Sequence, residues 1–316
     1  MHAKGVHSHT VIRMPTPKAG ALAGLSDLSS SLAAAVSRGA DSVVAIHARR
    51  RIPSSGIIWR DDVVVSASHT VKRDGEVPIT LPNGEPSTAT VIGRDAGADL
   101  VALRLATKGT PAPRAAADVL RVGALVLAVG RPGNAATASF GIVSAIRDGW
   151  RSWDGTRLGR VARLDLNVYD GFSGGALVDA SGALVGLNNS ALSRGAAVAL
   201  PVDAVECVLD ELLERGHVRR PYLGISAQPV IIAPADGDEH SALLITSVAA
   251  DSAAQRAGLL VGDVLRAAAG RPLGHPTDLL DVLADSTAGD AVPLDVLRGG
   301  VPHSVTVTPG DRRAGE

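Results

Sequence analysis

Cysteine and aromatic residues are scarce in this chain. Its 316 residues include one cysteine, and only 2% are aromatic. A single cysteine, Cys207, cannot form a disulfide within the chain. Its position on the apolar face of a predicted helix indicates a small buried hydrophobic residue. With 46% hydrophobic residues but few aromatics, the core must be built from Val, Leu, Ile and Ala, and packing alone must hold it together.

A strong net charge and long hydrophobic runs are also absent from the sequence. The net charge of −1 gives no indication of binding to nucleic acid or to an anionic membrane surface. No segment reaches the roughly 20 consecutive apolar residues of a transmembrane helix. The N-terminus does not have the pattern of a signal peptide. As it stands, the sequence therefore favours a cytoplasmic protein without an integral membrane segment.

Residues 1–41 are predicted to form an N-terminal tail and a short helix. His2, His7 and His9 could bind a metal ion, but a solvated tail is the favoured interpretation of this polar segment. Residues 26–37 have the pattern of a short amphipathic helix that packs on the domain that follows.

The length of 316 residues predicts about two domains. Residues 42–216 alternate short apolar runs with Gly, Pro and Asn turns, which is typical of an all-β barrel or sandwich. This region ends in a helix whose apolar residues recur at helical spacing. Asp203 is its predicted N-cap and Gly216 its stop.

The rest of the chain is predicted to be a linker, a second domain and a tail. Residues 217–221 form a basic linker, and residues 311–316 form the tail. Residues 222–310 between them mix strands with two short helices, near 252–258 and 277–285. The second domain is therefore predicted to be of the α+β class.

One serine lies in a turn that would expose its hydroxyl. Ser173 lies within the string Asp170-Gly171-Phe172-Ser173-Gly174-Gly175, after an apolar strand. Because glycine tolerates backbone conformations closed to other residues, the chain can turn sharply here and point amide groups into a cleft. A serine hydroxyl alone is a poor nucleophile. It needs a histidine as base and a carboxylate that orients the histidine.

Two upstream residues supply this base and this carboxylate. His69 comes at the end of the apolar run 63–65, and Asp99 directly precedes the apolar run 100–105. Alone, His69 could be a structural histidine, Asp99 a turn residue and Ser173 part of a glycine-rich loop. Together, at strand ends and in the order His69, Asp99, Ser173 that chymotrypsin has, they predict the catalytic triad of a serine protease.

Longer strings of residues extend this pattern along most of the chain. The protease part contains Ser54-Ser55-Gly56-Ile57-Ile58, Ser68-His69-Thr70-Val71, Gly97-Ala98-Asp99-Leu100, Gly130-Arg131-Pro132-Gly133 and Ser173-Gly174-Gly175-Ala176-Leu177. The second part contains Tyr222-Leu223-Gly224-Ile225, Ala257-Gly258-Leu259 and Gly262-Asp263-Val264-Leu265. In this order the strings resemble the HtrA/Deg family of trypsin-like serine proteases with a PDZ domain. The resemblance covers about residues 42–310.

This resemblance implies a mainly β fold, with a chymotrypsin-like double β-barrel followed by a small α+β PDZ domain. It implies that Ser173 attacks a peptide carbonyl, that His69 transfers the proton, and that Asp99 orients the imidazole. The backbone N–H groups of Gly171 and Ser173, with Phe172 between them, would form the oxyanion hole. No metal and no organic cofactor is implied.

The specificity pocket is predicted from the same resemblance. Val168 and Asp170 would line one wall, and Val198 and Leu200 another. Because most of this lining is apolar, we expect cleavage after small aliphatic residues such as Val or Ala.

In the PDZ domain, the backbone amides of Leu223, Gly224 and Ile225 are predicted to hold a C-terminal carboxylate. The expected partners are unfolded or C-terminally exposed polypeptides. The loop Arg147–Arg163, with Trp150 and Trp153, matches the position of the family's regulatory loop. The PDZ domain would then recruit substrates to the protease or gate it.

Three features depart from the family pattern. Phe172 stands where the family usually has Asn, although this side chain points away from the nucleophile in related enzymes. The N-terminal segment lacks the aromatic residues that usually build the family's trimer contact, so a homo-trimer has little support. The family prior favours the bacterial periplasm or envelope, whereas the sequence itself favours the cytoplasm, and both locations stay open.

The favoured function is that of an ATP-independent serine endopeptidase in protein quality control or regulated proteolysis. A catalytically silent protease-like chaperone or peptide-binding scaffold is the alternative, and Phe172 is the residue that favours it. An esterase would use the same triad but would not need a PDZ domain. Cleavage of an unfolded protein separates these functions.

Overall fold

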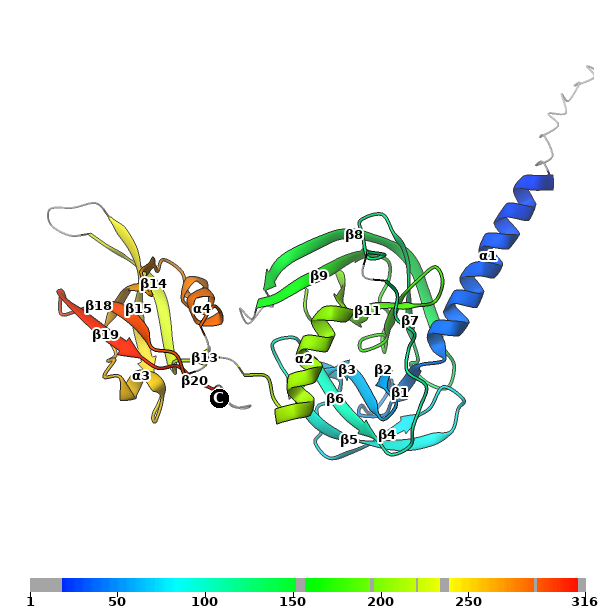
Figure 1. Ribbon diagram of the computed structural model, residues 1–316, viewed down its shortest axis with the longest axis horizontal. Helices are drawn as coiled ribbons and strands as arrows, with labels where there is room; N and C mark the ends of the chain where they lie inside the picture. Colours follow the sequence, from blue (N-terminus) through cyan, green and yellow to red (C-terminus); the bar gives the residue numbers. More distant parts are fainter. Residues whose placement is uncertain are drawn as a thin grey trace, which may run out of the picture.

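Two closed β-barrels and a smaller α+β domain follow one another along the chain (Figure 1). The computed structural model describes residues 19–116, 118–151, 157–193, 196–219, 221–233, 239–286 and 289–311. The predicted mainly β class, with a double barrel before a PDZ domain, is confirmed. Trp153 and the three N-terminal histidines lie outside the described residues.

The first barrel closes in the strand order β1-β2-β3-β6-β5-β4. Its strands are β1 Val43–Ile46, β2 Ser54–Arg60, β3 Val63–Ala67, β4 Glu76–Thr80, β5 Pro86–Asp95 and β6 Leu100–Leu105. The barrel closes where Ile46 of β1 pairs with Ile79 of β4. All five residues of β3 are buried, since one face points into the barrel and the other toward the second barrel and a helix. These aliphatic strands build the core without a single disulfide, as the composition requires.

The second barrel closes in the order β10-β11-β12-β9-β8-β7. Its strands are β7 Leu125–Gly130, β8 Thr137–Arg151, β9 Arg157–Asp165, β10 Ala176–Asp179, β11 Leu184–Asn189 and β12 Ala197–Pro201. Its interior contains Phe172, which is fully buried although it lies in the connection between β9 and β10. That connection, residues 166–175, therefore enters the core of the second barrel.

Helix α1, Ala19–Ala40, is longer than the predicted helix of residues 26–37. Only its last turns pack on the body, where Ala35 is fully buried and Gly39 lies against Val178 of β10. Leu25 and Leu28 are 65% and 47% exposed, and Figure 1 shows the helix extending away from the barrels. The predicted packing on the following domain is therefore limited to the last turns of the helix. The extra length follows from a segment rich in alanine, the strongest helix former.

Helix α2, Val202–Arg215, crosses both barrels after β12. It buries Val205, Leu209 and Leu212, and it stops at Gly216 in the left-handed conformation, as predicted. Asp203 is not the N-cap, because the cap position is Pro201 and Asp203 lies in the first turn, where its charge complements the helix dipole.

Cys207 is exposed, so the prediction of a buried thiol was wrong. The reason is helix geometry, since a residue two positions after the buried Val205 lies about 200° around the helix from it.

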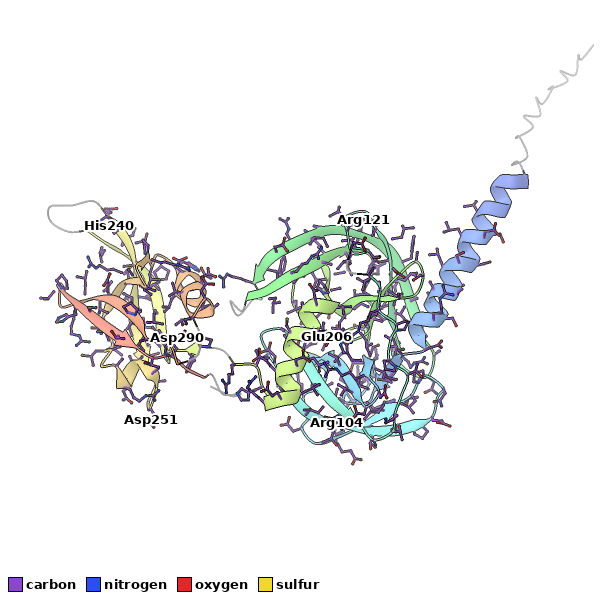
Figure 2. The ribbon with its side chains drawn as sticks, viewed as in Figure 1. Arg104, Arg121, Glu206, His240, Asp251 and Asp290 are labelled. Atoms are coloured by element: carbon purple, nitrogen blue, oxygen red, sulfur yellow. The ribbon has the colours of Figure 1, made fainter. Side chains whose placement is uncertain are left out.

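Glu206, labelled in Figure 2, joins α2 to the first barrel. Its carboxylate accepts a hydrogen bond from Trp59 Nε1 at 2.9 Å and forms ion pairs with Arg60 and Arg114. The guanidinium of Arg114 also lies over the Trp59 ring, 5.3 Å from its centroid.

The C-terminal domain is a sheet in the order β14-β15-β16-β18-β19, with β17 paired to β16 and a separate pair, β13 and β20. Its strands are β13 Pro221–Tyr222, β14 Ile225–Ile232, β15 His240–Val248, β16 Val264–Ala268, β17 Arg271–Pro272, β18 Val292–Arg298, β19 Val301–Val307 and β20 Gly310–Asp311. Its helices are α3 Ala253–Arg256 and α4 Pro276–Ala284. Strand β14 forms one edge of the sheet, and α4 lies beside it.

In the described part of the chain, no helix combines the length and the apolar character that crossing a membrane requires.

Candidate active site

His69 and Asp99 lie next to each other at the ends of two paired strands of the first barrel. Strand β3 pairs with β6 in a register that puts Ala67 opposite Leu100, so the residues just after β3 lie beside those just before β6. His69 lies in the single 3-10 turn η1, Ser68–Thr70. Its Nδ1 is 2.5 Å from Asp99 Oδ2, and its backbone N–H donates to Asp99 Oδ1 at 2.7 Å. The carboxylate therefore holds both the ring and the backbone of His69.

The backbone of Asp99 is in the left-handed region, with φ of 52°. Such a conformation costs an L-residue on the order of 1 kcal/mol or more, although Asp accepts it better than most. The backbone carbonyl of Asp99 accepts a hydrogen bond from Ser68 N–H at 2.9 Å, which supports this conformation. The residue is 8% exposed, so its charge interacts mainly with protein groups.

Asn189, at the end of β11, is a site residue that the sequence analysis missed. Its Nδ2 donates to Asp99 Oδ2 at 2.8 Å, and its Oδ1 accepts from the backbone N–H groups of Ala191 and Leu192. The residue is fully buried. The signal that could have found it is the run Asn188-Asn189-Ser190, three polar residues directly after a buried apolar strand.

Ser173 lies in the connection between β9 and β10, pressed against the first barrel. Gly174 has φ of 86°, and a Cβ at this position would overlap the carbonyl oxygen of Ser55 and the hydroxyl of Ser66. Gly174 N–H donates to Asn188 O at 2.9 Å, and Asn188 N–H donates to Gly175 O at 2.8 Å. These contacts bring Ser173 to the end of β11, next to Asn189 and the His69–Asp99 pair.

The segment of the three predicted oxyanion-hole residues is fixed by hydrogen bonds to the first barrel. Gly171, with φ of 86°, has its carbonyl bound by Ser55 Oγ at 2.6 Å. Ser55 Oγ in turn accepts from Arg131 N–H at 2.7 Å. Among the described residues, no group accepts a hydrogen bond from the backbone N–H of Gly171 or of Ser173.

Arg131 anchors this region to the start of the first barrel. Its guanidinium is buried and donates to the backbone carbonyls of Val43, Asn134 and Ala40. Burial lowers the pKa of this guanidinium from its ordinary value.

Phe172 is a core residue, although it lies between Gly171 and Ser173. It is fully buried, and its ring meets that of Tyr169 edge to face, with centroids 5.4 Å apart. Its ring also fills the space beside Gly130, where a Cβ would overlap it. The side chain therefore serves as the anchor of the connection that carries Ser173.

The four predicted pocket residues lie in different surroundings. Val198 and Leu200 are fully buried in the cluster that packs against α2. Val168 is half-buried and packs against the cluster that contains Phe172, whereas Asp170 is exposed. On β12 the intervening residue Ala199 faces the cluster of Phe172. These contacts do not test whether the two predicted walls face one another, so the specificity pocket stays a prediction.

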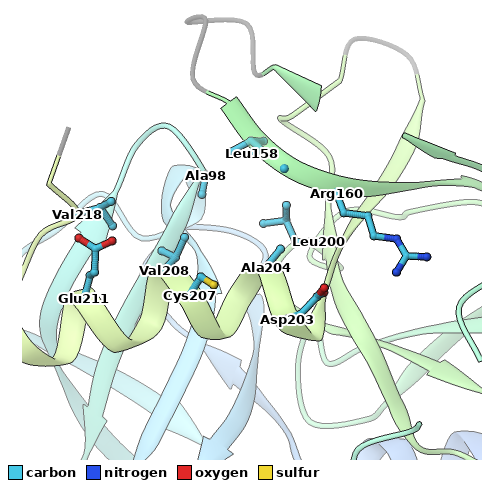
Figure 3. Close-up of a pocket in the computed structure, with 11 residues that line it drawn as sticks. Ala98, Leu158, Arg160, Leu200, Asp203, Ala204, Cys207, Val208, Glu211 and Val218 are labelled. Carbon is cyan, nitrogen blue, oxygen red and sulfur yellow. The ribbon is translucent and has the colours of Figure 1, made fainter. Parts of the chain in front are cut away.

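Leu200 lines a different hollow, shown in Figure 3. This groove of about 400 Å³ runs between α2 and β9, and Ala98, the residue before Asp99, also lines it. Its walls are mostly apolar, with Asp203, Glu211 and Cys207 contributed by α2 (Figure 3).

The predicted carboxylate-binding residues of the second domain form a fixed loop before β14. The carbonyls of Leu223 and Gly224 accept hydrogen bonds from the N–H groups of Ala254 and Ala249. Gly224 has φ of 80°, and a Cβ there would overlap Ser252. Within the described residues, the amides of Leu223 and Gly224 donate to no backbone carbonyl. Ile225 begins the edge strand β14.

No three His, Cys, Asp or Glu side chains gather as metal ligands among the described residues.

Comparison with known proteins identifies both domains. Residues 54–187 match the family model of the trypsin-like peptidase domain, and residues 244–298 match that of the PDZ domain. A probable periplasmic serine endoprotease DegP-like protein from Halomonas elongata is 31% identical over 273 residues, 83% of this chain and 57% of the relative. The chain belongs to the HtrA/Deg family.

Other HtrA/Deg members agree with this assignment. The periplasmic pH-dependent serine endoprotease DegQ of Escherichia coli is 30% identical over 256 residues, 78% of this chain and 56% of DegQ. The solved structure of the HtrA-type protease AlgW with tripeptide aligns with a TM-score of 0.66 at 27% identity, over 90% of this chain and 98% of the AlgW chain. The chain spans somewhat more than half the length of the curated relatives it matches.

Proposed function

We propose that this HtrA/Deg chain is an ATP-independent serine endopeptidase that cleaves unfolded or C-terminally tagged proteins. The observation that carries the proposal is the short His69 Nδ1–Asp99 Oδ2 contact of 2.5 Å, with the glycine turn of Ser173 placed beside it by β11. Both curated relatives described above are named serine endoproteases.

The proposed reaction is acyl transfer through Ser173. His69 takes the proton of the Ser173 hydroxyl as its oxygen attacks the peptide carbonyl, while Asp99 fixes the imidazole and stabilises its charged form. The oxyanion is held by the N–H groups of Gly171 and Ser173, both without an acceptor in the described part of the chain. Loss of one such donor typically costs about 3–4 kcal/mol. His69 then returns the proton to the leaving amine. Water next attacks the acyl ester on Ser173, with His69 again acting as the base, and the hydroxyl of Ser173 is restored.

The surroundings of Phe172 support catalysis over a silent scaffold. A large residue beside the nucleophile would argue against activity if its side chain occupied the site. Here the ring is fully buried among the residues of the second barrel, and the N–H groups on either side of it stay available.

For the residue before the cut, we propose a small aliphatic side chain such as Val or Ala. The support is compositional, because the residues that β12 offers, 197–200, are Ala, Val, Ala and Leu. A substrate series with Val, Phe or Arg at this position tests it, and a preference for Arg would contradict it.

For the PDZ domain, we propose that a peptide C-terminus binds along β14 and changes the activity of the protease. An edge strand offers an unpaired backbone to an extended peptide, and the loop before it offers free amides to the carboxylate. AlgW, the related protease described above, has been solved with a tripeptide. Arg151 of β8 forms an ion pair with Asp281 of α4, which connects the predicted regulatory loop to the helix beside β14.

The experiment that tests the proposed function compares wild type with Ser173→Ala on an unfolded, casein-like protein, and follows cleavage by mass spectrometry. We expect cleavage by wild type only. No cleavage by wild type, with or without added C-terminal peptides, would favour the silent scaffold.

A second experiment tests the proposed role of the PDZ domain. Peptides with a free or an amidated C-terminus are added to wild type and to Asp281→Ala, and the cleavage rate is measured. We expect the free peptide to change the cleavage rate of wild type and to change that of Asp281→Ala less. An equal effect of the free and amidated peptides would contradict carboxylate recognition.

A further inference from the structure

The hydroxyl of Ser173 is bound by a second serine. Ser173 Oγ lies 2.8 Å from Ser190 Oγ, and the backbone N–H of Ser190 donates to Ser173 Oγ at 3.3 Å. Among the described residues these are the hydrogen bonds of the Ser173 hydroxyl, and none joins it to His69. Ser190 therefore sets the direction of the nucleophile in the substrate-free chain.

Ser190 is fixed in place by the residue before it. Asn189 is fully buried, donates to Asp99, and accepts from the N–H groups of Ala191 and Leu192 on the far side of Ser190. The backbone on both sides of Ser190 is thus tied to one buried amide side chain. The contact with Ser173 is therefore fixed by the hydrogen bonds at the end of β11.

Ser190 is more exposed to solvent than the serine it contacts. Ser173 is 5% exposed, whereas Ser190 is an exposed residue. A substrate carbonyl must approach the Ser173 oxygen to about 3–3.5 Å before attack. The Ser190 hydroxyl already occupies a position 2.8 Å from that oxygen.

We propose that Ser190 is a positioning residue that holds the Ser173 hydroxyl in a resting direction, turned from His69, until substrate displaces it. This inference rests on the proposed function of Ser173 as nucleophile. It goes further by naming the group that must release that nucleophile before each reaction.

The number of hydrogen bonds that a hydroxyl can donate and accept explains why this contact must be released before reaction. A hydroxyl has one proton and two lone pairs, and attack needs the proton directed to His69 and one lone pair directed to the carbonyl carbon. The Ser190 N–H occupies one lone pair. If Ser190 Oγ–H donates as well, no lone pair is free; if Ser173 donates to Ser190, its proton is not available to His69. In the first arrangement one of the two hydrogen bonds from Ser190 must break before attack, and in the second the bond between the hydroxyls must break.

The test is the reaction of Ser173 with phenylmethanesulfonyl fluoride, a small reagent that makes little use of substrate subsites. The Ser173 oxygen forms a bond to sulfur, the S–F bond breaks, and the hydroxyl proton passes through His69 to solvent. Saturation kinetics separate the inactivation rate constant from the binding constant of the reagent, and mass spectrometry identifies the adduct on Ser173.

We expect Ser190→Ala to raise the inactivation rate constant about 2- to 10-fold, the range expected for one neutral hydrogen bond, with little change in reagent binding. Ser190→Thr keeps a hydroxyl and should react like wild type. Ser87→Ala is the matched control, because it removes an exposed hydroxyl that pairs with Thr107 Oγ1 at 3.1 Å on the first barrel. It should leave both constants unchanged.

An unchanged or lower rate constant in Ser190→Ala would overturn the inference while leaving the proposed nucleophile in place. The same rise in Ser190→Thr would also overturn it, since the hydroxyl would then not be the cause. If no adduct forms on Ser173 in any variant and wild type leaves unfolded protein intact, the proposed function fails and the inference fails with it.

Discussion

The first barrel supplies His69 and Asp99 from the ends of two strands that pair with each other, whereas the second supplies Ser173 from a connection without regular structure. In the first barrel the ladder between β3 and β6 sets the distance between the two side chains. In the second, glycines pressed against Ser55 and Ser66, a buried phenylalanine and hydrogen bonds to β11 set the position of the serine. One part of an active site can therefore be positioned by strand register and another by close contacts of a loop. We expect substitutions in these two parts to have different effects on activity.

The largest effect is expected at the contact between the barrels. Gly174→Ala puts a methyl group onto the Ser55 carbonyl and the Ser66 hydroxyl, and also strains a backbone at φ of 86°. The connection must shift, which moves Ser173 and the N–H groups beside it. We expect cleavage to fall by about 1,000-fold or more, measured on the unfolded-protein substrate.

Gly123→Ala is the control for backbone strain alone. Gly123 has φ of 84°, but a Cβ there meets no atom within 4 Å. We expect it to lower the unfolding midpoint slightly and to leave the cleavage rate of the folded protein unchanged. Equal loss of activity in both variants would mean that strain, and not the contact with the first barrel, is responsible.

The next largest effect compares the two cores. Phe172→Ala and Ile58→Ala each empty a fully buried site, one in the second barrel and one inside the first. Both should cost about 3–5 kcal/mol in urea unfolding. Under conditions where each variant is folded, only Phe172→Ala should also lose activity, because its side chain anchors the segment that carries Ser173. Full activity in folded Phe172→Ala would show that the connection is held without its anchor.

A smaller effect is expected where the second barrel contacts the carboxylate of the first. Asn189→Ala removes the hydrogen bond to Asp99 Oδ2, and hydrogen bonds to charged groups contribute about 1.5–3 kcal/mol. We expect kcat to fall about 10- to 150-fold. Asn83→Ala, in an exposed turn where Asn83 Oδ1 accepts from Glu85 N–H, should not change kcat. A kcat for Asn189→Ala within twofold of wild type would show that the ladder of the first barrel orients Asp99 by itself.

The smallest effect is expected on the surface of the first barrel. Asp62 Oδ2 accepts from Arg104 Nη1 at 2.6 Å, and this hydrogen bond holds the pKa of Asp62 below its ordinary value. A lowered pKa in the folded state stabilises the fold at pH values above the unfolded pKa of about 4, and this contribution is lost as the pH falls through the folded value. Because the pair is exposed, the difference in unfolding midpoint between wild type and Asp62→Asn should be small at pH 7. It should shrink as the pH falls below about 4, and a difference that grows toward low pH would contradict this origin.

Much of the fold followed from local pattern. The helix predicted near residues 277–285 is α4, Pro276–Ala284, and Gly216 ends α2 as expected. The runs before His69 and after Asp99 are β3 and β6, because continuous aliphatic residues with buried faces are a local signal. These elements needed no knowledge of their partners.

The errors concern what each element packs against. Cys207 was expected to be buried and is exposed, and the helix expected at residues 26–37 begins earlier and packs on the body only through its last turns. Both segments were correctly predicted to be helical. For Cys207 the helical spacing itself gives the reason, since the residue lies nearly opposite the buried Val205, whereas how much of α1 is covered depends on the partner surface.

By itself, the sequence determined the mainly β class, the family, and the positions of His69, Asp99 and Ser173 along the chain, since these depend on residue type and on local conformation. Only the tertiary structure decided that Asn189 supports Asp99 from 90 residues away and that Ser190 holds the hydroxyl of Ser173. It also decided that Phe172 is part of the core. Contacts of this kind form when the two closed barrels bring distant segments together, and no local pattern of residues records them.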